Sequence, residues 1–502
     1  MDRQPNVPVV WEDSNVASGV FLLPEILDRI SSYMPKNEVA CTLRLVNKVT
    51  AAHFDRPGDR IVRVSELVPH HAFVARYGDP GIRKRLDFNT RLQLLRLVAR
   101  SGSIPNLAFA IEAMGIVLAE NPPACLFSEA AAEGHLDVCK WLLQQGYRWK
   151  RCGSALSAAA RAGHRVMCEW LLANGHPRSI EAPAAAAEGS HIGLMEWLAK
   201  QHQRSAQSIG IIRTSTLKGI ARGCSLSVLM QHFAAGEPIE DDHAKADVLA
   251  AAASSSTSDW RAKVEWLELQ GYPLARAACT EVLNRISPAE DAMDRLRWLR
   301  GRGYPVDDET AEAAAYAGNV AALQEILLWN GSIQLGEIDL GFVASRGHLD
   351  VLKFLHQRGF HPDRYDAWNA ARGGRLHVLE WLFEEVGLAD VEGLLGQAAR
   401  SGSVELMAWL HARGAHMEED VMCGAAEAGC EETLEWLAEH YDIQAVPAQP
   451  CAYYVALVNG DMATLRCLRR LGCPRDSSCD APYLSTCAEK KYPQWVSEWL
   501  LR

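Results

Sequence analysis

Residues 130–146 read AAAEGHLDVCKWLLQQG, and variants of this phrase recur along the chain. Residues 159–175 read AARAGHRVMCEWLLANG, and residues 343–359 read VASRGHLDVLKFLHQRG. In each copy a run of small residues leads to Gly-His, an apolar stretch follows, and a glycine closes the unit. Self-similarity at a fixed spacing is the signature of a solenoid, in which stacked units share one continuous core.

The repeat has a period close to 28 residues. Trp141 and Trp170 are 29 residues apart, and the closing glycines at 303, 331, 359, 387 and 414 step by 28, 28, 28 and 27 residues. A unit of this length holds two short helices. Apolar residues at helical spacing give the second helix one buried face, and the closing glycine suits the left-handed conformation that ends it.

This phrase resembles the ankyrin repeat, in a short variant with Trp in place of the usual Leu. The resemblance covers residues 92–502; it is regular at 123–200 and 309–443 and divergent at 92–118, 205–307 and 450–502. It implies an all-α, ankyrin-type helical solenoid of about 12–14 two-helix repeats. The period is shorter than the usual ~33 residues, and the Thr-Pro-Leu-His opening is missing, so we expect shortened fingers between units.

Composition limits the function classes. The 502 residues carry a formal charge of −11, which argues against general binding to nucleic acid or to an anionic membrane surface. The charge is uneven: residues 51–100 hold ten Arg/Lys and five Asp/Glu, whereas residues 401–450 hold one Arg and ten Asp/Glu. The acidic block is interpreted either as a docking face for a basic partner or as a solvated helix face.

The sequence also indicates where the protein works. It has no apolar run long enough to span a bilayer, no signal-peptide pattern in residues 1–10, and no Cys-x-x-Cys pair among its fourteen cysteines. We expect buried, reduced thiols in a cytoplasmic or nuclear protein that is a monomer outside its complex. Motifs for nucleotide binding, zinc proteolysis and serine hydrolysis are missing, so we expect no enzyme, cofactor or metal site.

A second signal lies at residues 20–54. Residues 21–35 read FLLPEILDRISSYMP, where proline suits a first helical turn, and a second helix ends in RLVNK at residues 44–48. The segment resembles an F-box, although the Trp that often follows is missing. The resemblance implies docking on a Skp-type adaptor of a cullin-based ubiquitin ligase. The docking or packing residues would be Leu23, Pro24, Ile26, Leu27, Ile30, Val39, Leu43 and Val46. The alternative is that these helices only cap the solenoid.

The remaining segments complete the organisation. Residues 1–19 are expected to form a flexible N-terminus, and residues 55–91 a loop-rich connector with a short strand at 60–64 and an exposed His70-His71 pair. The recurring His135, His164 and His348 are interpreted as structural groups that hydrogen-bond between adjacent turns. The repeated Trp position is assigned to the core.

Partner recognition is expected from side chains that follow the closing glycines and do not repeat, because loops on one edge can vary while the scaffold stays fixed. Such side chains can also cover the helix end. The candidates are Tyr147, Arg148, Trp149, His176, Arg178, Tyr272, Tyr304, Phe360, His361 and Met417. The sequence therefore favours a substrate-recruiting ligase adaptor. A plain ankyrin scaffold without a ligase link is the alternative.

Overall fold

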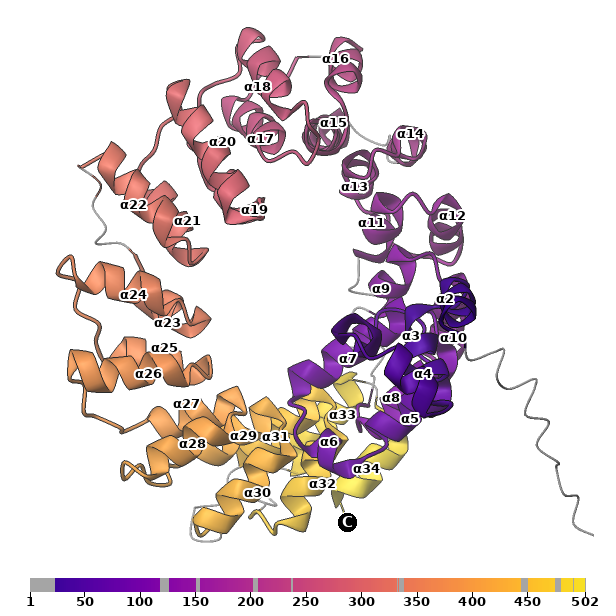
Figure 1. The fold of residues 1–502 in the computed structure, drawn as a ribbon, viewed down its shortest axis with the longest axis vertical. Coiled ribbons are helices and arrows are strands. Elements are labelled where there is room, and N and C mark those ends of the chain that lie inside the picture. Colours follow the sequence, from indigo (N-terminus) through magenta and orange to yellow (C-terminus); the bar gives the residue numbers. More distant parts are fainter. Residues whose placement is uncertain are drawn as a thin grey trace, which may run out of the picture.

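The computed structural model describes residues 23–117, 126–149, 154–201, 206–235, 238–331, 333, 338–443, 450–474, 480–490 and 492–501. Within these ranges the chain forms fourteen consecutive helix pairs, α7/α8 to α33/α34, arranged as a closed ring (Figure 1). The described residues contain no strand beyond one isolated bridge. The predicted all-α solenoid is confirmed. The expected flexible N-terminus, residues 1–19, lies outside the described residues.

The first helix of each pair lies toward the centre of the ring (Figure 1). These helices stack side by side because alanines such as Ala159, Ala186 and Ala314 are fully buried between neighbours. The inner helices are α7 (Phe88–Arg100), α9 (Leu126–Ala132), α11 (Ser154–Arg161), α13 (Ala182–Glu188), α15 (Ala206–Gly223), α17 (Asp242–Ala253), α19 (Ala277–Arg285), α21 (Asp308–Tyr316), α23 (Leu340–Arg346), α25 (Arg364–Arg372), α27 (Leu394–Ser401), α29 (Val421–Ala428), α31 (Pro450–Asn459) and α33 (Asp480–Lys490).

The second helix of each pair lies on the outside. Trp141, Trp170 and Trp409 are half-buried and pack against the core, and Trp381 is buried, so the assignment of the repeated Trp to the core is confirmed. The outer helices are α8 (Ile104–Ala113), α10 (Leu136–Gln144), α12 (Arg165–Ala173), α14 (Ile192–Lys200), α16 (Leu226–Ala234), α18 (Trp260–Leu269), α20 (Ala289–Gly301), α22 (Val320–Trp329), α24 (Leu349–His356), α26 (Leu376–Trp381) with the π-helical turn η4 (Leu382–Val386), α28 (Val404–His411), α30 (Glu431–His440), α32 (Met462–Arg470) and α34 (Gln494–Leu501).

The Gly-His phrase joins one unit to the next. Gly134 has a φ of 77°, and the ring of His164 from the following unit occupies the space where a Cβ would lie. His164 Nε2 donates a hydrogen bond to the carbonyl of Ala132 over 3.1 Å. His348 lies against Gly318 in the same way. The predicted role of the recurring histidines between adjacent turns is confirmed for His164.

The connector is more helical than predicted. It contains η2 (Pro57–Arg60), α5 (His70–Tyr77) and α6 (Pro80–Lys84), and His70 begins a helix, not a loop. The strand expected at residues 60–64 does not form. The Asn37 side chain takes the place of a strand partner: its Oδ1 accepts from the Arg63 backbone N–H, and its Nδ2 donates to the Arg63 carbonyl.

The two ends of the solenoid meet and close the ring. In Figure 1 the purple α7 and α8 lie beside the yellow α31 to α34. The backbone N–H of Val117 donates to the carbonyl of Gly460 over 2.8 Å, and that of Met462 donates to the carbonyl of Gly115 over 2.9 Å. We call this junction, between residues 83–117 and residues 429–470, the seam.

Candidate interaction surfaces

The F-box-like segment is a small helical unit with a small core of its own, while its Ala40 and Cys41 belong to the main core of the chain. It comprises α2 (Pro24–Ser32), α3 (Lys36–Cys41), the 3-10 turn η1 (Leu43–Leu45) and α4 (Lys48–His53). Leu27, Val39 and Phe54 form its buried centre, and Met34 and Leu43 pack against them. Among the predicted residues, Leu27 and Val39 therefore hold the segment together and do not present a docking surface.

The other F-box-like positions are more accessible. Leu23 is 48% exposed and Val46 is 64% exposed, and Pro24 is also exposed, while Ile26 and Ile30 are half-buried. The structure adds apolar residues that the resemblance did not supply: Tyr33, Leu45 and Val49 are exposed as well. Leu45 ends η1, Val46 comes directly after it, and Val49 lies in the first turn of α4.

The side chains that follow the closing glycines divide into three groups. Arg148, Arg178 and His361 are exposed, and Tyr147, Phe360 and Met417 are half-buried. The expectation of an exposed edge is wrong for the other four, which are 3–6% exposed: Trp149, His176, Tyr272 and Tyr304.

Packing at the helix ends explains why these four are buried. Trp149 packs edge-on against Phe127 and Trp170, with ring centroids 5.2 and 5.9 Å apart. The hydroxyl of Tyr304 donates to Glu268 of the preceding unit over 2.9 Å. These side chains cover the end of a helix, which is the alternative role considered from the sequence.

The inner layer carries an aromatic surface that the sequence reasoning missed. Tyr316, Phe342 and Tyr365 stand on the successive inner helices α21, α23 and α25, and we call them the inner aromatic patch. The Tyr316 and Phe342 rings are 4.7 Å apart, and the Tyr365 ring lies against the backbone of Gly341. Phe342 is 37% and Tyr365 is 56% exposed. The available signal was an aromatic residue in a helix where other units carry mostly alanine.

Electrostatic contacts reinforce the seam. Arg91 and Asp461, whose side chains are 3% and 1% exposed, form a buried ion pair, with Nη1 and Oδ1 2.9 Å apart. Arg91 also donates to the carbonyls of Met114 and Gly429, over 2.8 and 2.6 Å. Burial removes solvent screening, so this pair is far more sensitive to loss of one partner than a surface pair.

The acidic block takes part in the same junction. Lys84 Nζ lies 2.7 Å from Glu435, and Arg85 lies 3.5 Å from Glu432. The basic segment 51–100 and the acidic segment 401–450 thus attract each other within one chain. Neither interpretation of the acidic block from the sequence included this internal role.

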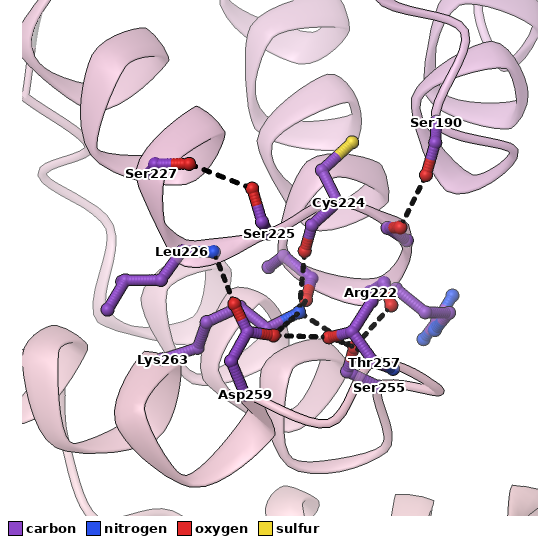
Figure 2. Close-up of polar contacts among 12 residues, drawn as sticks. Ser190, Arg222, Cys224, Ser225, Leu226, Ser227, Ser255, Thr257, Asp259 and Lys263 are labelled. Carbon is purple, nitrogen blue, oxygen red and sulfur yellow. Dashed lines mark hydrogen bonds and ion pairs between the residues drawn. The ribbon is translucent and has the colours of Figure 1, made fainter.

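Among the described lysines, Lys263 is fully buried (Figure 2). Its Nζ donates to the carbonyls of Ala221 and Cys224 and to the hydroxyl of Ser255, over 2.7, 2.8 and 2.7 Å. Burial lowers its pKa to about 8. All three N–H groups are satisfied and the side chain is inaccessible, so Lys263 braces α15, α17 and α18 together where the Gly-His phrase is missing.

Across the described part of the chain, no cluster of three or more His, Cys, Asp or Glu is suited to a metal ion. No helix in the described ranges is long and apolar enough to cross a membrane. Cys139 and Cys168 are fully buried, which raises the pKa of each thiol to about 12, in line with the expectation of buried thiols.

The fold and its surfaces define an all-α repeat protein built for binding. A family model described as ankyrin repeats (many copies) matches residues 127–172, which cover α10, α11 and nearly all of α9 and α12. The chain therefore carries ankyrin repeats in this stretch. Repeat scaffolds of this kind bind other macromolecules, generally without catalysis.

Comparison with solved structures gives distant likenesses. The pentatricopeptide repeat protein PPR10 in complex with an 18-nt psaJ RNA element is 12% identical, with a TM-score of 0.24 over 94% of this chain and 89% of that chain. PPR10 from maize is 10% identical, with a TM-score of 0.24 over 95% and 96%. Superpositions this poor transfer no property to this chain. A search of curated proteins gives no match.

Proposed function

We propose that this protein is a substrate-recruiting adaptor of a cullin-type ubiquitin ligase in the cytoplasm or nucleus. The F-box-like helices would bind a Skp-type adaptor, and the solenoid would bind the protein to be ubiquitinated. The mechanism is proximity, because holding a target beside a ligase raises its effective concentration. The repeats support the coarser part of this proposal, a protein-binding module.

The exposed apolar residues at η1 and α4 carry the ligase half of the proposal. Leu45, Val46 and Val49 are 66%, 64% and 48% exposed. A helix pair that served only as a cap would bury such side chains against the solenoid. Here the ends of the solenoid cover each other at the seam, and these residues remain in solvent. Neighbouring exposed apolar side chains are typical of protein interaction sites.

A binding measurement tests this half. Purified full-length protein is titrated with a Skp-type adaptor in biolayer interferometry, and the double variant Leu45→Asp, Val46→Asp is expected to bind at least 100-fold more weakly. Val166→Asp is the matched control, because Val166 is 68% exposed and lies on α12, among the repeats. The circular dichroism spectra of both variants should show the same helix content as that of the wild type.

Two outcomes would count against the ligase link. A folded wild-type protein that does not bind the adaptor would leave the alternative, an ankyrin scaffold without a ligase connection. Equal weakening by the double variant and by Val166→Asp would mean that the contact lies elsewhere or is non-specific.

The inner aromatic patch supports the target-binding half. Exposed aromatic side chains dominate the binding energy of many interfaces. In proximity labelling in cells, some proteins that the wild type labels should therefore no longer be labelled when Phe342 and Tyr365 are both changed to alanine. Leu328→Ala is the control, because Leu328 is 83% exposed on the outer helix α22. Identical labelled sets from all three proteins would refute the assignment of the target to this patch.

A further inference from the structure

The seam contains a cleft whose walls come from opposite ends of the chain. Its volume is about 670 Å³, within the usual range for ligand sites. Phe109 and Trp141 line it from α8 and α10, and Met462 and Trp495 line it from α32 and α34. Because one wall belongs to each end of the solenoid, this cleft exists only while the ring is closed.

The cleft has a polar extension. A second cavity of about 210 Å³ adjoins the first, and the two share Arg83, Glu112 and Arg466. Arg91 and Arg470 line the smaller cavity as well. The larger cavity, a chamber whose lining mixes apolar and polar side chains, therefore adjoins a group of arginines.

Two of these arginines are already neutralised. Arg91 is paired with Asp461 inside the seam. Arg470 lies 2.7 Å from Glu435 and 3.4 Å from Glu431. Their charges are satisfied within the protein, so they add little attraction for a ligand.

Arg83 and Arg466 are available to pair with an acidic ligand. Arg83 Nη1 donates to the carbonyl of Ala113 over 3.0 Å, but its Nε is buried without a hydrogen-bond partner. Arg466 is exposed and has no hydrogen-bond or ion-pair partner within the described ranges. The two cavities share Arg83, Arg466 and the acid Glu112, so their common wall carries two basic groups and one acidic group in a chain of net charge −11; Glu431, which lines the smaller cavity, lies 3.4 Å from Arg470.

We infer that the seam cleft binds an acidic peptide segment of a partner protein. A large apolar side chain of the peptide fills the chamber between Trp141 and Trp495, and neighbouring carboxylates pair with Arg83 and Arg466. Charge complementarity favours this occupant: an apolar peptide would leave the arginines unused, and a basic peptide would be repelled. The site is independent of any link to a ligase.

Peptide selection on the intact protein tests the inference. A phage library of random 12-residue peptides is panned on full-length protein, and the enriched peptides are synthesised with a fluorophore. We expect Trp, Phe or Leu next to Asp or Glu. In fluorescence polarisation, Arg466→Glu and Trp495→Ala should each weaken binding at least tenfold. Arg372→Glu reverses an exposed charge on α25, away from the cleft, and should leave binding unchanged.

Several results would overturn the inference. These are no enrichment, enriched peptides without acidic residues, or equal binding by wild type and Arg466→Glu. Displacement of the peptide by an RNA oligonucleotide, with the oligonucleotide equally sensitive to Arg466→Glu, would assign the arginines to phosphate groups of RNA instead.

Discussion

The buried ion pair between Arg91 and Asp461 should decide whether the ring stays closed. Replacing Arg91 by methionine keeps most of the side-chain volume but leaves Asp461 buried without its counter-charge. Removing one partner of a buried pair costs about 3–5 kcal/mol. The carbonyls of Met114 and Gly429 also lose their charged donor.

The remaining seam contacts can be weighed against this cost. Each of the two backbone hydrogen bonds contributes about 1 kcal/mol. The half-buried pair of Lys84 with Glu435 contributes about 1 kcal/mol, and the exposed pair of Arg85 with Glu432 contributes about 0–1 kcal/mol. Phe88, buried at the seam, adds about 2 kcal/mol. Their sum is comparable with the cost, and Ile116 and Met462 are also buried at the seam, so Arg91→Met should shift the balance between the closed ring and an open one toward the open ring by most of that cost.

Small-angle X-ray scattering and urea denaturation measure the two consequences. Arg91→Met should raise the radius of gyration and lower the unfolding midpoint. The control is Arg161→Met, which removes an exposed pair with Glu188 between α11 and α13, and should cost less than about 1 kcal/mol without changing the scattering. A scattering curve for Arg91→Met that superimposes on that of the wild type, with a midpoint shifted no further than in the control, would refute the reasoning.

Three further results are expected. Gly163 has a φ of 79°, and Gly163→Ala places a methyl group on the His191 ring, so it should lower the free energy of unfolding in urea by about 2–4 kcal/mol. In the control Gly146→Ala the methyl group meets open space, and the loss should be about 1–2 kcal/mol. Equal losses of stability in the two variants would contradict the contact with His191. The pKa of Lys263 falls to about 8 on folding, so above that pH the unfolded chain binds more protons than the folded one. The free energy of unfolding of the wild type, relative to that of Lys263→Met, should therefore rise by about 2 kcal/mol from pH 7.5 to 9.5. Parallel stability curves of the two proteins against pH would exclude this. Burial raises the pKa of Cys139 to about 12. Iodoacetamide should therefore modify this thiol roughly a thousandfold more slowly in the folded protein than in the urea-unfolded protein, as measured by mass spectrometry. Comparable modification rates would show that the thiol is accessible.

The repeat units could be predicted because their signals are local. Gly134 and His164 are one repeat apart, and the same pair of residue types returns in later units, so periodicity alone locates the helices. Local signals were insufficient at the helix ends. Trp149 and Tyr304 follow closing glycines in what looked like exposed loops, but short connections fold such side chains back over the neighbouring helix end.

The ring closure and its cleft could not be predicted from local patterns. Arg91 and Asp461 are 370 residues apart, and neither stands in a recognisable motif. The opposite charges of residues 51–100 and 401–450 were visible, but a charge excess does not indicate whether its partner lies in the same chain. That information depends on the rotation between successive units, summed over fourteen helix pairs, and no single unit encodes it.

Closure also changes how the proposed adaptor would work. In an open solenoid each unit contacts only its neighbours, so small rotations at successive interfaces add up along the array. About half a ring separates the F-box-like helices from the inner aromatic patch (Figure 1), and in an open chain this distance would vary with every interface between them. Joining the ends requires these rotations to sum to a fixed total, which restricts their spread. A target held on the patch would then meet the ligase in a narrow range of positions, so the effective concentration depends on the seam as much as on either binding surface.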